Sequence, residues 1–151
     1  MNMIQKAKEQ VQELTKQAYT AAVKENLLPD GVTVEPSVEI PKDVSNGDYT
    51  TTFCLAAAKA MKMNPRQVAT ILTEHMALEG SYFTSVEIAG PGFMNFRLGD
   101  KWFGDTVTAI ESAGPDYGCS DMLKGRKIMV EFVSANPTGP MHMGNARGGV
   151  L

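Results

Sequence analysis

YFTSVEIAGPGFMNFRL, residues 82–98, is the stretch that decides the fold. Two apolar runs rich in β-branched and aromatic residues, 82–89 and 93–98, flank the tripeptide Gly-Pro-Gly. Glycine and proline favour a tight turn, so we expect two antiparallel strands joined as a hairpin.

Amphipathic helices are predicted on both sides of this hairpin. Residues 3–25 carry apolar side chains at three- and four-residue spacing, which is typical of a helix with one buried face. Residues 101–112 form another such helix. Asn64 as the N-cap and Pro65 at the first helical position begin a third, which we expect to end at Gly80.

The segment before Asn64 predicts one strand and one more helix. Residues 32–40 alternate between apolar and polar, and Pro36 places this strand at a sheet edge. After a polar loop, Asp48 and residues 50–52 can cap a helix that runs to about Met63.

These elements predict an α+β fold, with helices packed on a mostly antiparallel sheet, for a first domain of residues 1–118. A strand at 127–133, a turn-rich loop and a helix from 141 follow. We expect residues 119–151 to be the first strand–loop–helix of a Rossmann-type α/β catalytic domain. Because half of a parallel unit cannot bury its strand, we expect the chain to be the N-terminal fragment of a longer one.

Composition narrows the class of protein. The 151 residues are 43% hydrophobic and 21% charged, which excludes a mostly disordered chain. We find no membrane span and no signal peptide, and we expect a cytoplasmic location. The two cysteines and two histidines have no metal-type spacing, so we expect no structural metal. The net charge is −3, yet residues 124–151 carry four basic residues against Glu131 alone, which favours an anionic partner such as phosphate.

Residues 127–151, KIMVEFVSANPTGPMHMGNARGGVL, carry the candidate chemistry. A strand followed by a glycine- and proline-rich loop and a helix start is typical of a phosphate site at a sheet edge. His142 and Asn145 share one face of the first helical turn, and both can donate hydrogen bonds to phosphate or ribose oxygens. Glu131, as a carboxylate beside such a site, indicates a cationic co-substrate.

The run EFVSANPTGPMHMGNARGG resembles the first active-site motif of class I aminoacyl-tRNA synthetases, specifically that of arginyl-tRNA synthetases. Its HIGH tetrapeptide is His-Met-Gly-Asn at residues 142–145, with asparagine in place of the second histidine. Asparagine keeps a donor but cannot become cationic. The segments NGDY (46–49), NPR (64–66) and AGPGFMNF (89–96) resemble landmarks of the family's N-terminal additional domain, so the resemblance covers nearly the whole chain.

The resemblance implies adenylate formation from arginine and ATP with Mg²⁺, followed by transfer to tRNA(Arg), in a monomeric enzyme. It assigns catalysis to His142 and Asn145. The residues that it assigns to ATP are His142, Gly144 and Asn145. Those that it assigns to arginine are Glu131, Ser134 and Asn136. The motif loop between them consists of Ala135, Pro137, Thr138, Gly139 and Pro140.

The same resemblance implies that the first domain contacts the D-loop at the tRNA elbow. Phe93 and Asn95 match the family's base-contacting positions, Phe93 by stacking and Asn95 by hydrogen bonds to the base edge. Phe93 could instead be a core residue, and Glu131 could pair with Arg147 rather than with a substrate. The chain lacks the second class I motif, KMSKS, so we expect it to be inactive alone.

Two other functions stay open at this point. One is a free-standing RNA-binding module without catalysis. The other is a nucleotidyltransferase that uses a similar His-x-Gly-Asn site on a small phosphorylated substrate.

Overall fold

The computed structural model describes residues 2–131, 135–136 and 138–145. It confirms the predicted α+β class: four helices and a four-stranded antiparallel sheet lie within the described residues. By internal contacts the chain divides into two units, Met1–Gly118 and Cys119–Leu151. Their roles as a tRNA-binding domain and the start of a catalytic domain stay predictions.

The sheet has the strand order β1-β2-β4-β3. Its centre is β4 (Phe93–Leu98), which pairs with β3 (Phe83–Ala89) on one side and with β2 (Tyr49–Thr51) on the other. The short β1 (Val38–Glu39) pairs with β2. The predicted hairpin is thus confirmed.

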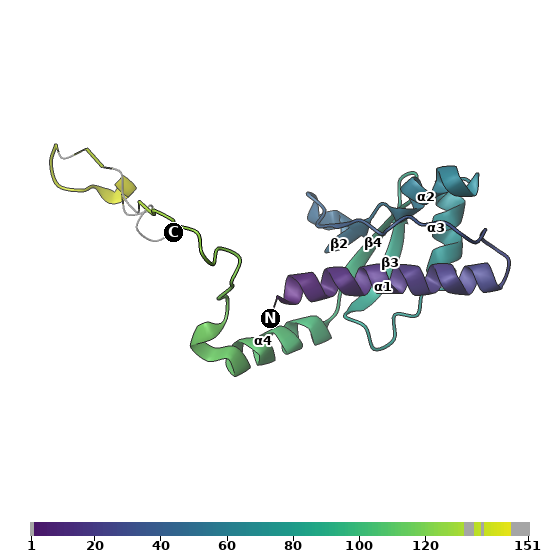
Figure 1. Cartoon of the computed structure of the whole chain (residues 1–151), viewed down its shortest axis with the longest axis horizontal. Coiled ribbons are helices and arrows are strands. Elements are labelled where there is room, and N and C mark those ends of the chain that lie inside the picture. Colours follow the sequence, from purple (N-terminus) through teal and green to yellow (C-terminus); the bar gives the residue numbers. More distant parts are fainter. Residues whose placement is uncertain (1, 132–134, 137, 146–151) are drawn as a thin grey trace. The chain divides into compact units, whose positions relative to one another are not determined.

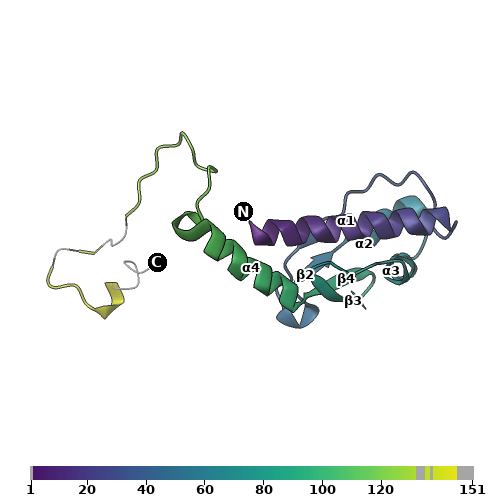
Figure 2. The same ribbon diagram turned by 90° about the horizontal axis from the view of Figure 1, so that it is seen from below.

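Helices α1 (Met3–Lys24), α2 (Phe53–Met61) and α3 (Pro65–Glu74) cover one face of the sheet (Figures 1 and 2). On β4, Met94 and Phe96 point toward these helices and are fully buried. Successive side chains of a strand point to opposite faces. The other β4 residues, at positions 93, 95 and 97, therefore lie on the face that the helices leave open.

One predicted strand before Gly80 has wrong bounds, and a second strand was not predicted. The strand expected over 32–40 is only Val38–Glu39, because Pro36 lacks an N–H and the chain pairs only after it. The helix expected after Asp48 and residues 50–52 is confirmed as Phe53–Met61, with Thr52 as its N-cap. Thr50 belongs instead to β2, which the sequence analysis missed.

The end of α3 also differs from the prediction. Asn64 caps the helix as expected, because its Oδ1 accepts a hydrogen bond from the Arg66 N–H at 2.9 Å. The helix ends at Glu74 rather than near Gly80, with His75 as the C-cap. The Nδ1 of His75 lies 2.7 Å from the Ile71 carbonyl oxygen, one of the carbonyls left without an intrahelical partner at the end of a helix.

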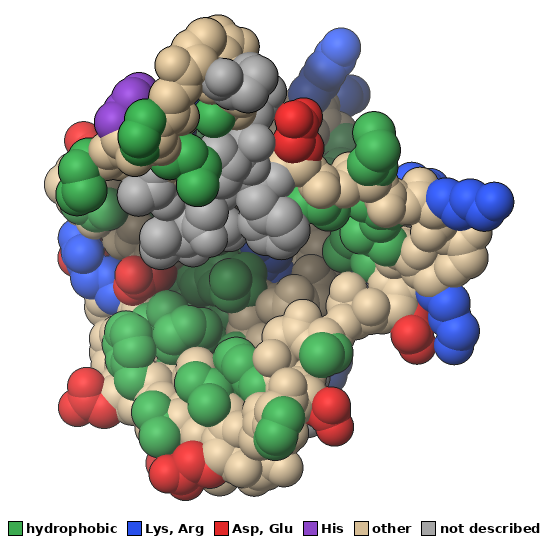
Figure 3. Space-filling model, turned by 90° about the vertical axis from the view of Figure 1, so that its left-hand side faces the viewer, with side chains coloured by type: hydrophobic (Ala, Val, Ile, Leu, Met, Phe, Trp, Pro, Cys, Tyr) green, Lys and Arg blue, Asp and Glu red, His purple; other side chains and the backbone are tan. Residues whose placement is uncertain are grey.

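The last helix of the first unit is α4 (Asp100–Ala113), close to its predicted bounds. Trp102 attaches it to α1, because its indole N–H donates to the Met3 carbonyl oxygen at 3.2 Å. Hydrophobic side chains lie at the surface of the face shown in Figure 3. The exposed large hydrophobic side chains of α4 are Phe103, Val107 and Ile110.

The Rossmann-type start is not seen in the second unit. Residues 127–131 form no strand, and residues 132–133 of the predicted strand lie outside the described residues. Of the helix predicted over 141–151, residues 143–145 are helical and the remainder again lies outside the described residues. No described helix combines the length and apolar character that crossing a membrane needs.

Candidate nucleic-acid interface

A pocket of about 230 Å³ opens on the sheet face that the helices leave uncovered. Residues from β2, β3, β4 and the 41–46 segment meet there. The lining residues are Pro41, Asn46, Thr50, Ala89, Phe93 and Asn95. The two residues predicted to contact a tRNA base, Phe93 and Asn95, therefore line one cavity.

The polar side of this pocket is unusual because its groups have no partners. Asn95 is 7% exposed, and its side-chain amide makes no hydrogen bond to any described residue. Thr50 lies directly opposite Asn95 in the ladder between β2 and β4. Its hydroxyl oxygen is buried and also lacks a partner within the described part of the chain. Buried polar groups are normally hydrogen-bonded, so the Thr50 hydroxyl lacks a partner that it needs, and the Asn95 amide, which is not fully enclosed, can accept from or donate to a ligand.

The apolar side consists of Phe93 with its cross-strand neighbour Ala89 and with Pro41. Phe93 is half-buried and lies outside the buried core cluster. Among the described aromatic residues it is paired with no other ring, so its face is available for stacking. A flat aromatic wall beside an amide suits a planar heterocycle that also forms hydrogen bonds along its edge.

Three hydrogen bonds hold the segment that carries Asn46 against β4. The Asp48 N–H donates to the Phe96 carbonyl oxygen at 2.8 Å, and the Asp48 carboxylate accepts from the Leu98 N–H at 2.8 Å. The Arg97 guanidinium donates to the Ser45 carbonyl oxygen at 2.7 Å. These bonds fix the segment at the pocket edge.

The hairpin tip beside Phe93 is held against α3. A Cβ at Gly92 would lie 2.9 Å from the Cβ of Pro65, so only glycine allows this approach. The Arg66 guanidinium donates to the Gly90 carbonyl oxygen at 3.1 Å, which places a cation at the tip.

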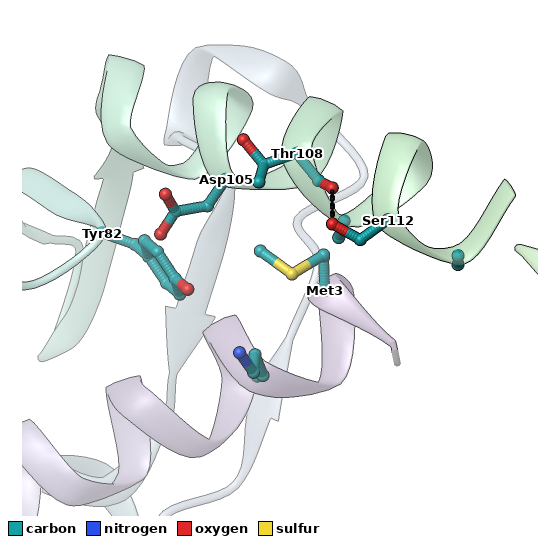
Figure 4. Close-up of a pocket in the computed structure, with 8 residues that line it drawn as sticks. Met3, Tyr82, Asp105, Thr108 and Ser112 are labelled. Atoms are coloured by element: carbon teal, nitrogen blue, oxygen red, sulfur yellow. Dashed lines mark hydrogen bonds between the residues drawn. The ribbon is translucent and has the colours of Figure 1, made fainter.

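A larger cavity of about 440 Å³ lies between α1 and α4 (Figure 4). Three of its polar side chains are paired with other described residues. Asp105 bonds to Lys101 at 3.2 Å, and the Ser112 hydroxyl donates to the Thr108 carbonyl oxygen at 2.7 Å, the bond drawn in Figure 4. The Thr108 hydroxyl donates to Gly104 at 3.1 Å. The lining also contains Lys6 and Tyr82 but no side-chain amide, so this cavity lacks the amide beside an aromatic face that the smaller pocket has.

In the second unit the structure brings three predicted ATP residues into one local turn. The His142 Nδ1 accepts from the Gly144 N–H at 3.1 Å, and the Asn145 Oδ1 accepts from the His142 N–H at 3.1 Å. A neutral histidine that accepts at Nδ1 carries its proton on Nε2. The His142 Nε2–H and the Asn145 amide N–H groups remain as donors, and this donor set fits phosphate oxygens.

The other predicted residues of the second unit are not assembled into a site. Glu131 and Asn136 are exposed, and Glu131 forms no ion pair with another described residue. The loop residues Ala135, Thr138, Gly139 and Pro140 are exposed as well. The predictions for Ser134 and Pro137, and the alternative pairing of Glu131 with Arg147, fall outside the described residues.

Sequence reasoning missed four pocket residues: Pro41, Asn46, Thr50 and Ala89. Asn46 had a signal, because it begins the NGDY segment of the resemblance. Thr50 could have been found only from the β2–β4 register, which joins residues 45 positions apart along the chain.

Comparison with known proteins identifies the family. The family described as "Arginyl tRNA synthetase N terminal domain" matches residues 3–98. The chain belongs to this family. The match contains the helices α1 to α3, all four strands and the whole 230 Å³ pocket.

Named relatives agree with this membership. The "Arginine--tRNA ligase" of Acetivibrio thermocellus is 45% identical over 150 residues, and that of Listeria monocytogenes serotype 4b is 40% identical over 151 residues. These matches cover 99% and 100% of the present chain. The chain spans 27% of the length of each of these relatives.

A solved structure shows the same fold. The arginyl-tRNA synthetase of Plasmodium falciparum superimposes with a TM-score of 0.53, at 8% identity, over 66% of this chain and 17% of that one. The α+β arrangement of this chain thus recurs in a structure whose sequence has diverged.

Proposed function

We propose that the chain is the N-terminal part of an arginine–tRNA ligase, and that its first unit binds the D-loop at the elbow of tRNA(Arg). One observation carries the proposal: Phe93 and Asn95 line a single pocket in which an aromatic face adjoins the side-chain amide of Asn95, a residue that is only 7% exposed.

The pocket suits an unstacked base rather than a duplex. Sequence-specific RNA recognition mostly uses loop bases that are turned out, stacked on aromatic rings and hydrogen-bonded along their edges. Stacking on Phe93 is expected to contribute about 1–3 kcal/mol of binding free energy. Asn95 would add selectivity, because a base that forms no hydrogen bond to its amide leaves a desolvated polar group without a partner, which weakens binding.

The charge distribution agrees with a local contact. The chain carries a net charge of −3, so a broad basic surface is not its mode of binding. Arg66 of α3, bonded to the hairpin tip, and Arg97 of β4, which lies 3.8 Å from a Glu87 carboxylate oxygen, place positive charge at the tip and on the open face. A base pocket with few phosphate contacts predicts a shallow salt dependence of the affinity.

In the complete ligase, the second unit would serve the reaction of arginine with ATP. The donors of His142 and Asn145 would stabilise the phosphates as charge develops on them. Gly144 would leave room for the adenine. Glu131 would pair with the charged arginine side chain, with Ser134 and Asn136 beside it. Mg²⁺ would enter with ATP.

We further propose that the 151-residue chain forms no arginyl-adenylate alone, and that the parent enzyme is a cytoplasmic monomer. Arginine-dependent exchange of pyrophosphate into ATP, measured on this chain beside a complete arginine–tRNA ligase, checks the first point. Exchange by the chain itself would contradict it.

The decisive experiment compares Phe93→Ala with Phe103→Ala, which removes an exposed ring on α4 away from the pocket. Each variant is titrated with tRNA(Arg) and with the same tRNA made abasic at single D-loop positions, at several salt concentrations. We expect Phe93→Ala to weaken binding about tenfold or more. The dependence of the Phe93→Ala affinity on salt concentration should stay unchanged. Phe103→Ala should bind with the affinity of the unmodified chain.

At one D-loop position, removing the base should weaken binding as much as Phe93→Ala does. With that abasic tRNA, Phe93→Ala should cause no further loss of affinity, because the two changes remove the same contact. Equal affinities of both variants and of all abasic tRNAs would show that the pocket does not hold a D-loop base.

A further inference from the structure

The Thr50 hydroxyl is the one side-chain polar atom in the described residues that is buried without a hydrogen-bond partner. Several other threonine hydroxyls among the described residues have partners nearby in the chain. Those of Thr15 and Thr20 donate to carbonyls one helical turn back, and Thr51 accepts from the Phe53 N–H at 3.3 Å. Valine would fill the space of Thr50 without an unpaired oxygen. The unpaired hydroxyl therefore calls for an explanation beyond packing.

The position of Thr50 indicates where its partner lies. Thr50 and Asn95 are directly opposite in the β2–β4 ladder, and both line the pocket. Side chains at directly opposed positions on one sheet face have Cβ atoms about 4.5–5.5 Å apart, which is within reach of one hydrogen bond after small side-chain rotations. The amide of Asn95 is itself unpaired. Two unpaired polar groups therefore face each other at the wall of one pocket.

An asparagine amide presents different chemistry at its two ends. Its oxygen only accepts and its nitrogen only donates, so a half-turn of the amide changes which base edge it matches. Nothing in the described residues holds the Asn95 amide in one of these orientations. A hydroxyl beside it can donate to the amide oxygen or accept from the amide nitrogen, and either bond holds the amide in place and leaves its other end for the ligand.

We propose that Thr50 is a positioning residue for Asn95: when a base fills the pocket, the Thr50 hydroxyl bonds to the Asn95 amide and fixes which end meets the base edge. The proposal rests on the proposed function, because it names the residue that gives the D-loop pocket its selectivity. In this role Thr50 acts on the base through the Asn95 amide.

The test uses Thr50→Val, which keeps the shape and removes the hydroxyl, and Thr50→Ser, which keeps the hydroxyl. Thr84→Val, on an exposed position of β3 outside the pocket, is the matched control. Each variant is titrated with tRNA(Arg) and with a tRNA(Arg) in which the D-loop base identified with Phe93→Ala is exchanged for one of opposite donor–acceptor pattern. The thermal midpoint of each variant is measured without RNA.

We expect Thr50→Val to bind tRNA(Arg) about five- to tenfold more weakly and to lose most of its preference over the exchanged tRNA. Thr50→Ser should stay within about twofold of the unmodified chain in both respects, and so should Thr84→Val. The thermal midpoint of Thr50→Val should be equal or higher, because it no longer buries an unpaired hydroxyl. Weaker binding by a protein of equal or greater stability is a result that a purely structural role of Thr50 does not produce.

Two outcomes overturn the inference and leave the proposed function intact. In the first, Thr50→Val binds and discriminates like the unmodified chain while Phe93→Ala weakens binding. In the second, Thr50→Ser loses as much as Thr50→Val, which shows that side-chain shape and not the hydroxyl matters. If Phe93→Ala also binds normally, the proposed function and the inference are both overturned.

Discussion

Gly47 lies against the carbonyl oxygen of Phe96, so closely that a Cβ at position 47 would be 2.8 Å from that oxygen. The φ angle of Gly47 is +88°, a region that other residues rarely adopt. Both facts follow from how the segment carrying Asn46 folds onto β4. The pocket wall is therefore possible only with glycine at this position.

The first prediction compares Gly47→Ala with Gly31→Ala. Gly31 has a similar φ of +82° and nothing within 4 Å of an added Cβ. The backbone cost of about 1–2 kcal/mol applies to both variants, and the collision with Phe96 applies only to Gly47→Ala. We expect Gly47→Ala to lose about 1–2 kcal/mol more free energy of unfolding in a denaturant titration, since overpacking typically costs that much. It should also weaken tRNA(Arg) binding. Equal losses in the two variants would show that the segment moves away from β4 without cost.

The second prediction concerns the reactivity of the two cysteines. Burial raises the pKa of the Cys54 thiol to about 12, whereas Cys119 is exposed. The thiolate is the reactive form, so near pH 8 only about one Cys54 in ten thousand carries it. We expect the native chain to take up one equivalent of iodoacetamide, at Cys119, and the denatured chain to take up two.

Mass spectrometry of the labelled chain measures this stoichiometry. The Cys119→Ser variant is the control and should remain nearly unlabelled until it is denatured. Rapid labelling of native Cys119→Ser would mean that α2 opens on the timescale of the reaction.

The elements that could be predicted from sequence are those with strong local patterns. The 3.6-residue spacing of residues 3–25 and the turn between the two runs of 82–98 each decide an element from neighbouring residues alone. The structure confirms both, with α1 at Met3–Lys24 and the hairpin of β3 and β4. Short elements were harder to predict, because three residues such as Tyr49–Thr51 become a strand only when β4 lies beside them.

The same reason explains what was missed in the candidate site. Asp48 resembles a helix N-cap in the sequence, but its carboxylate accepts from the Leu98 N–H, a bond between residues 50 positions apart. Phe93 and Asn95 were named through the resemblance to a family, and their shared pocket is a finding of the structure. The juxtaposition of Thr50 with Asn95 depends on strand register, which local patterns do not determine.

The third prediction tests how α4 is attached. Trp102 is the single tryptophan of the chain, and its indole donates to the Met3 carbonyl oxygen at 3.2 Å. Trp102→Phe keeps an aromatic ring but loses this hydrogen bond, which contributes about 1 kcal/mol. We expect its free energy of unfolding to fall by about 1–2 kcal/mol, because the smaller ring also leaves space.

Circular dichroism in a denaturant titration measures this loss without the tryptophan signal. Phe103→Leu is the matched control, since its ring is 54% exposed, and it should change the free energy of unfolding by less than about 0.5 kcal/mol. A comparable loss in both variants would mean that general helix packing, and not the bond to Met3, holds α4.

The fourth prediction concerns the pH dependence of stability at His75, which joins the ends of α1 and α3. The hydrogen bond to the Ile71 carbonyl and, second, the bond to the Glu25 carboxylate raise the pKa of His75 above its ordinary 6.5. Its Nδ1 lies 2.7 Å from the Ile71 oxygen and its Nε2 lies 3.1 Å from a Glu25 oxygen. The protonated ring donates to both acceptors at once, so the folded state binds this proton more tightly than the unfolded state does.

The His75 contribution to stability is therefore fully present below about pH 6.5 and is lost as the pH rises through the raised pKa of the folded state. We expect the difference in thermal midpoint between the unmodified chain and His75→Asn to shrink between about pH 6 and pH 8. Glu25→Gln removes the second acceptor and keeps the first, so its own pH dependence should be intermediate. A difference that stays constant across this range would show that His75 keeps one protonation state throughout and acts only by packing.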